Sequence, residues 1–274
     1  MKEWALNMRI VGILMALISI LAAGLGFMLR RQEVATVFDP VSGLAEQGAS
    51  ISILLIAFSI AVIALLFGLS FALPKKELPA FRDAFGGSLF STISRAIWAL
   101  AVLAFAGLEL MELSQTGALD AFATVRLLAG LLAGLCLFLT AILGHRGVNV
   151  AIPAAMPVFW ICTWLIVSHI ERAADPVLLG YVYHLFALAA LLLSLYYIAG
   201  YAFQQNRSGR LIFCSCAAIY FIGVTMADEM LFSTRLTFLA LAATVLIYQL
   251  TLVVNLSRSD WKDIPYMERD MDEE

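Results

Sequence analysis

The chain has 274 residues, of which 62% are hydrophobic and only 14% are charged, and its formal net charge is −3. A water-soluble domain of this length needs far more polar surface than these residues supply. The composition therefore excludes an ordinary soluble globular protein and indicates a chain that is solvated largely by lipid.

Eight apolar runs recur along the sequence, and each is close to the roughly 20 residues that a helix needs to cross a bilayer core. A helix satisfies its own backbone hydrogen bonds, and lipid offers no other partners for them. We therefore predict an all-α polytopic transmembrane helix bundle in which residues 1–256 form a single membrane domain. The predicted spans are 10–29, 51–73, 92–112, 121–144, 150–170, 177–203, 211–227 and 236–255.

The first predicted span follows a basic start and has small residues spaced four apart. Its apolar run is longer than the roughly 7–15 residues of a cleaved signal peptide, so we expect a retained helix. Small side chains let helices approach closely in lipid, and two interpretations stay open, packing inside the bundle or a homodimer face. The pairs are Gly12–Ala16, Ser19–Ala23 and Ala22–Gly26, with Gly130–Gly134 in the fourth span.

The third and fourth spans form a hairpin with charged residues inside its apolar runs. Glu109 and Glu112 are three positions apart on one helix face, near the outer end of the third span. Folding the short link about residues 117 and 118 places Glu109 level with Arg126 on the next span. A charge in the bilayer is costly unless it is paired, so we predict a Glu109–Arg126 ion pair. Two roles stay open for it, a structural element or part of a polar substrate pocket.

The sixth predicted span places His184 roughly 10 Å below its outer end, at about 1.5 Å per residue. We expect this side chain to face the bundle, because an imidazole in hydrocarbon needs a hydrogen-bond partner. It is either a hydrogen-bonded packing group or a member of a solute site.

The sequence TMADEMLF, residues 225–232, interrupts an apolar stretch that would otherwise make a helix of about 67 Å, twice the bilayer thickness. The chain must turn there, and we expect the acids Asp228 and Glu229 to lie at the outer mouth, unburied. With Glu171 they form a set of outer-mouth acids near His169. Acids beside a histidine could attract a cation, although polar groups at helix ends need not be ligands.

Basic residues predict the orientation, because Lys and Arg collect in cytoplasmic loops. An arrangement with both termini inside puts 12 of the 17 Lys and Arg residues on the inner side, with Arg30 and Arg31 as exceptions. Residues 257–274 hold seven acidic and three basic side chains, and we expect them to form a short, disordered cytoplasmic tail.

The sequence contains no metal-binding helix motif, nucleophile elbow or phosphate loop, so we expect no enzyme, no cofactor and no metal. We expect an integral protein of a prokaryotic plasma membrane, whose partners are the lipid bilayer and other membrane proteins, and no nucleic acid. The favoured function is a non-enzymatic scaffold, sensor or accessory subunit. The alternative is a small-solute or cation transporter with a polar pocket in its outer half. The two differ in whether His184 and Glu109 converge on one water-accessible cavity.

Overall fold

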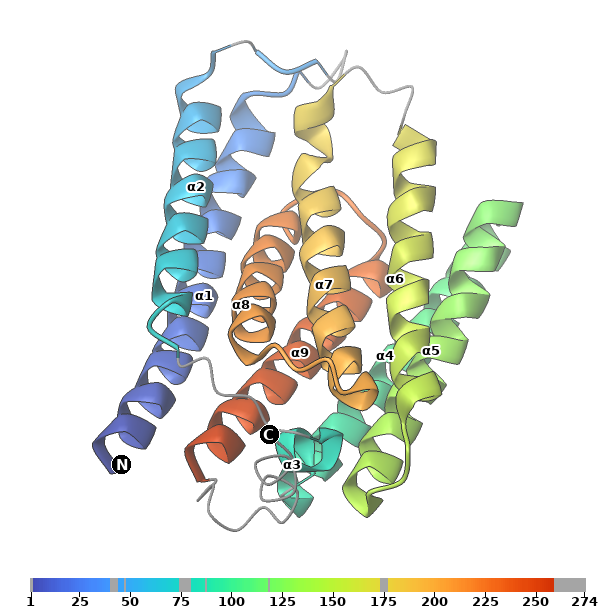
Figure 1. The fold of residues 1–274 in the computed structure, drawn as a ribbon. Helices are drawn as coiled ribbons and strands as arrows, with labels where there is room; N and C mark the ends of the chain where they lie inside the picture. Colours follow the sequence, from blue (N-terminus) through green and yellow to red (C-terminus); the bar gives the residue numbers. More distant parts are fainter. Residues whose placement is uncertain are drawn as a thin grey trace.

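The computed structural model describes residues 2–39, 44–46, 48–73, 80–86, 88–117, 119–172 and 177–258. These residues form a bundle of long helices in which α1 begins and α9 ends at the same end of the molecule (Figure 1). We call this the inner end and the opposite one the outer end. Of the predicted tail, residues 259–274 lie outside the described residues.

Within the described residues there are nine α-helices, two short 3-10 helices and no β-strand. Eight of the α-helices are long and apolar enough to cross a membrane, which confirms the predicted all-α bundle of eight spans. The helices are α1 Lys2–Thr36, α2 Ser50–Ser70, α3 Phe81–Phe85, α4 Leu89–Thr116, α5 Ala121–Arg146, α6 Ala151–Arg172, η1 Leu178–Gly180, α7 Val182–Gly200, η2 Tyr201–Phe203, α8 Ser208–Thr225 and α9 Phe232–Arg258.

Most helix ends differ from the predicted spans by a few residues, as three examples show. Helix α1 continues to Thr36, so that residues 30–36, predicted as loop, are helical. Helix α7 begins five residues later than predicted, because Tyr181 has a non-helical backbone with φ −134° and ψ 0°. The short helix α3 lies inside the predicted inner loop 74–91, since five residues are too few to show a helical hydrophobic period.

The turn between α4 and α5 explains why these two helices are antiparallel neighbours. Gly117 ends α4 in the left-handed region with φ 69°, which glycine adopts without steric strain. The Asp120 carboxylate then caps α5 by accepting a hydrogen bond from the backbone amide of Ala123 at 2.6 Å. The left-handed glycine and the aspartate cap reverse the direction of the chain within a few residues. The outer ends of α4 and α5 therefore lie level with each other.

The small residues singled out in the sequence pack inside the bundle. A Cβ atom added to Gly12 on α1 would lie 2.6 Å from Val253 on α9. One added to Gly134 on α5 would lie 2.8 Å from the backbone of Leu103 on α4. Such approaches require glycine, so these positions are used for contacts between helices of the same chain.

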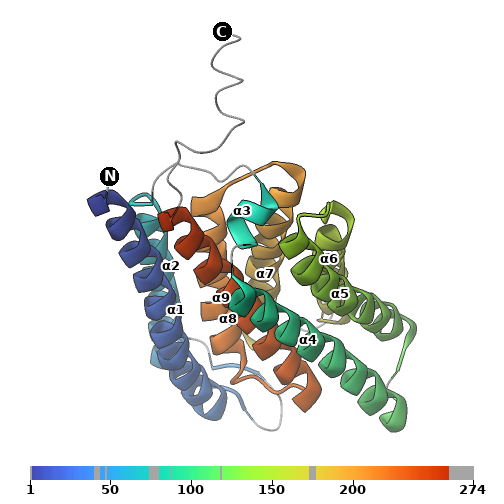
Figure 2. The same ribbon diagram turned by 90° about the horizontal axis from the view of Figure 1, so that it is seen from below.

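Helix α3 sits across the inner end of the bundle (Figure 2). Side chains from α4, α5 and α9 donate hydrogen bonds to three successive backbone carbonyl oxygens at its C-terminal end. The pairs are Arg95 with Phe85, His145 with Gly86 and Asn255 with Ala84. Arg95 is 1% exposed, and its guanidinium lies 5.1 Å from the ring centroid of Tyr248. Three long helices therefore hold this short helix at the inner end through its backbone.

Candidate functional site

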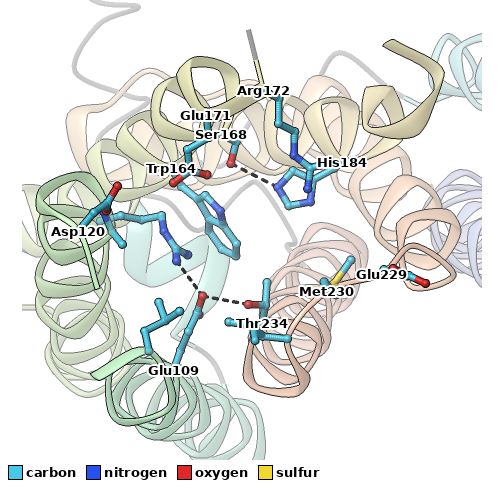
Figure 3. A pocket seen from close by; sticks show the side chains of 14 residues that line it. Glu109, Asp120, Trp164, Ser168, Glu171, Arg172, His184, Glu229, Met230 and Thr234 are labelled. Atoms are coloured by element: carbon cyan, nitrogen blue, oxygen red, sulfur yellow. Dashed lines mark hydrogen bonds and ion pairs between the residues drawn. The ribbon is translucent and has the colours of Figure 1, made fainter. Parts of the chain in front are cut away.

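A polar cavity of about 270 Å³ lies at the outer end, between the α4–α5 hairpin and helices α6, α7 and α9 (Figure 3). We call it the outer pocket. Side chains from five helices and from the loops at their outer ends line it: Glu109, Leu113, Asp120, Ala123, Arg126, Trp164, Ser168, Glu171, Arg172, His184, Glu229, Met230, Leu231 and Thr234.

Glu109 is the hydrogen-bonding centre of one wall. Its side chain is almost fully buried, and Oε1 accepts hydrogen bonds from Arg126 Nη2 at 2.8 Å and from Thr234 Oγ1 at 2.9 Å. The tight turn after α4 places Glu109 level with Arg126, and α9 supplies Thr234 from far along the chain. The buried carboxylate thus has both an opposite charge and a neutral donor, which offsets much of the desolvation cost.

The floor of the pocket is aromatic. The Arg126 guanidinium lies 5.2 Å from the ring centroid of Trp164, within cation–π range. Trp164 in turn stacks on Trp160, with ring centroids 5.6 Å apart, and lies 4.8 Å from the Phe238 ring. Trp160 and Trp164 are each 3% exposed, so the space beneath the pocket is filled by packed rings.

His184 forms part of the wall opposite Glu109, as Figure 3 shows. It is 6% exposed, and its Nε2 lies 3.4 Å from Ser168 Oγ, near the upper limit for a hydrogen bond. Its ring lies edge-on to Trp164 and Phe238, with centroids 6.2 Å and 5.3 Å away. His184 is therefore packed on its sides, and it borders the same cavity as Glu109.

The rim of the outer pocket has charges of both signs. Glu171 and Glu229 are exposed, and Arg172 lies with its guanidinium 5.6 Å from the ring centroid of Tyr181. Asp120 also reaches the lining, although one of its oxygens caps α5. A solute at this rim would meet both acidic and basic groups.

The prediction that Asp228 lies unburied at the mouth is wrong. It is 8% exposed, and its Oδ1 accepts a hydrogen bond from Arg30 Nε at 2.6 Å. Arg30 is 1% exposed and also donates to Glu33 Oε2 at 2.6 Å and to the Gly180 carbonyl at 3.1 Å. The reason is the extra length of α1, which carries Arg30 inside the helix and against the α8–α9 loop. Glu229, the next residue, is exposed as predicted.

Burial also affects the protonation of Asp228. Removal from water raises the pKa of its carboxyl above the ordinary range of aspartate, and the Arg30 guanidinium opposes this rise. Thr225 Oγ1 donates a further hydrogen bond to Asp228 Oδ2 at 2.9 Å. Loss of Arg30 would therefore raise the pKa of the Asp228 carboxyl further.

Glu112 and His169 were also singled out, and neither lines the outer pocket. Ser233 Oγ donates to Glu112 Oε2 at 2.6 Å, which ties α4 to α9 beside the pocket. His169 is exposed on α6. Among the described residues, no group of three or more His, Cys, Asp or Glu side chains is placed to hold a metal ion.

Several lining residues were not identified from the sequence, among them Trp164, Ser168 and Thr234. Serine and threonine are common in membrane helices and show no distinctive pattern there. Trp164 lies in an apolar run, where an aromatic residue is as consistent with a lipid-facing position as with a pocket floor. Their roles depend on which helices are neighbours, and local sequence does not report this.

The outer pocket combines charges of both signs and several hydroxyl groups over an aromatic floor, which suits a small polar solute held by ionic and hydrogen bonds. Comparison of this chain with known protein families, with curated proteins and with solved structures found no significant match.

Proposed function

We propose that this multi-pass membrane protein is a transporter that takes a small polar solute from the outer side into the outer pocket. The observation that supports this most is that Glu109 on α4 and His184 on α7 line one cavity. Ionisable residues inside membrane spans commonly mark the pathways of solutes and ions. Here they meet at the end of the bundle from which a solute would enter.

The lining also suggests the chemistry of the solute. Arg126 and Arg172 offer positive charge, and Glu171 and Glu229 offer negative charge at the rim. A cavity of about 270 Å³ is at or below the lower end of ordinary ligand pockets, roughly 300–1,000 Å³. A small molecule that has both an anionic and a cationic group, such as a free amino acid, fits these properties best.

A transporter also needs a closed inner side while its outer side is open. Beneath the pocket, Trp164 and Phe238 pack together, and at the inner end α3 packs against α5 and α9. The pocket is lined by residues of α4, α5 and α6 and by residues of α7 and α9. In the proposed cycle these two groups of helices move against each other, and α3 leaves its position when the inner side opens.

The second candidate is a non-enzymatic sensor or accessory subunit that binds the solute without passing it across a plasma membrane. The packed floor favours it, since Trp160 and Trp164 are 3% exposed and Ile161 is fully buried. A sensor of this kind would act through other membrane proteins that contact its lipid-facing helices.

Uptake into vesicles tests the proposal. The purified protein is reconstituted into liposomes, and a panel of radiolabelled amino acids, small amines and small carboxylates is added outside. The pocket variant is Thr234→Val, which removes a donor to Glu109, and the control is Thr251→Val on the same helix. Both threonines are 8% exposed, and Thr251 bonds to Ser91 away from the pocket.

Accumulation of one solute that is lost in Thr234→Val and kept in Thr251→Val would support transport. A solute that raises the unfolding temperature of the wild type but does not accumulate would support the sensor. Equal behaviour of the two variants, or no effect of any solute, would contradict a solute function for the outer pocket.

A further inference from the structure

A second cavity, of about 460 Å³, lies at the inner end between α6, the end of α7 and the start of α8. We call it the inner pocket. It is separate from the outer pocket, and the two share no lining residue. Its lining changes from polar at the η2–α8 connection to apolar along the face of α6.

The polar part of the inner pocket is positively charged. Arg207 and Arg210 line it, Gln205 adds a side-chain amide, and no acidic residue lies among the described residues of the lining. Within the described part of the chain, neither arginine forms an ion pair, whereas Arg30 and Arg126 at the outer end both do. Two guanidinium groups that have no counter-charge among the described residues suit an anion.

The apolar part faces the membrane. Phe159 on α6 is 65% exposed, Tyr196 on α7 is 56% exposed and Phe203 is 53% exposed. Large apolar side chains that are exposed on membrane spans contact acyl chains, and tyrosines gather at the level of the headgroups. The arginines therefore lie where headgroups lie, and the apolar wall extends from them toward the bilayer core.

We propose that the inner pocket binds an anionic phospholipid, with its phosphate between Arg207 and Arg210 and an acyl chain along Val158 and Phe159. Guanidinium groups bind phosphate oxygens with paired hydrogen bonds. Basic pockets between membrane helices on the cytoplasmic side bind anionic headgroups. The apolar wall selects a lipid over a soluble phosphate, because only a lipid covers both parts of the pocket.

Lipid titration of the purified full-length protein tests this. Phosphatidylglycerol and phosphatidylcholine are added separately in mixed micelles, and bound lipid is counted by native mass spectrometry. The pocket variant is Arg207→Gln with Arg210→Gln. The control is Arg9→Gln with Arg146→Gln, which removes the same charge from two exposed arginines at the same end.

We expect phosphatidylglycerol to bind the wild type and the control alike, and to bind the pocket variant at least about tenfold more weakly. Equally weakened binding of phosphatidylglycerol to the control would show that the lipid responds to surface charge in general. That result would overturn the proposed site. Equal binding of phosphatidylcholine would show that the headgroup charge is not recognised. If soluble glycerol phosphate bound the wild type as tightly as the lipid does, the pocket would be assigned to a free phosphate ester instead.

Discussion

Two arginine–carboxylate pairs at the outer end have the same chemistry and different surroundings. Arg30 and its partners Glu33 and Asp228 are sealed, with Arg30 only 1% exposed and the Phe38 and Tyr183 rings within 6 Å of its guanidinium. Arg126 and Glu109 are paired at a similar distance but border an open cavity.

The difference teaches how to separate structural charges from functional ones in a membrane bundle. Both pairs satisfy the rule that intramembrane charges are matched, so pairing alone does not identify a site. Access to open space does identify a functional pair, because a solute can contact only groups that border such space. The sealed pair is therefore interpreted as a connection among α1, α7 and the α8–α9 loop, and the open pair as part of a binding pocket.

Breaking the sealed pair should have the largest effect. Arg30→Gln leaves the two carboxylates Glu33 and Asp228 buried without a cation, and we expect it to destabilise the fold by about 3–5 kcal/mol. Thermal unfolding in detergent measures this. Arg31→Gln is the matched control, because Arg31 is the exposed neighbour on the same helix. Equal losses in both variants would contradict the assignment of a buried pair.

Breaking the open pair should have a smaller effect, and the two partners should depend on each other. Arg126→Ala alone leaves the Glu109 carboxylate with only Thr234, whereas Arg126→Ala with Glu109→Gln removes both charges. We expect the single variant to be less stable than the double one, with a coupling of about 1–3 kcal/mol in a thermal double-mutant cycle. Additive losses would show that the two residues do not interact.

The contact between Glu112 and Ser233 is a third, weaker link, because Glu112 is only partly buried. Removal of one hydrogen bond at such a position, in Glu112→Ala, should destabilise the fold by about 0.5–1.5 kcal/mol. Ser233→Ala should give a similar loss, and the double variant little more than either alone. A loss as large as that of Arg30→Gln would mean that Glu112 has a role that this contact does not explain.

The difference in access can be measured directly with two matched threonine-to-cysteine variants. Thr225 is fully buried beside Asp228, and Thr234 borders the outer pocket. We expect a water-soluble thiol reagent to label Thr234→Cys and to leave Thr225→Cys unmodified, with the wild type as the baseline for its native cysteines. Equal labelling of both would remove the distinction between the sealed and the open pair.

Local sequence was enough to predict the membrane spans and one ion pair. Length and apolarity define eight helices, because a bilayer imposes both. The Glu109–Arg126 contact joins residues 17 positions apart across a tight turn, so hairpin geometry alone brings them together. Neither inference requires knowledge of which other helices are neighbours.

The rest of the site depends on distant neighbours. Arg30 and Asp228 are 198 positions apart, and Glu109 and Thr234 are 125 apart. In a soluble protein the apolar face of a helix predicts its buried side, whereas in a membrane bundle the lipid-facing side chains are apolar as well. The sequence therefore contains no periodic signal that assigns helix neighbours, which is why Asp228 was placed wrongly and Thr234 was missed.

The position of Glu33 has a consequence for how the chain is made. Arg30 enters the membrane with α1, and its partner Asp228 is synthesised 198 residues later. At roughly 5–20 residues per second, that interval is on the order of 10–40 s. Glu33 lies one helical turn from Arg30 and pairs with it from within the same helix. The first span can therefore be inserted with its arginine already neutralised, and the long-range partner arrives only when the α8–α9 loop has been translated.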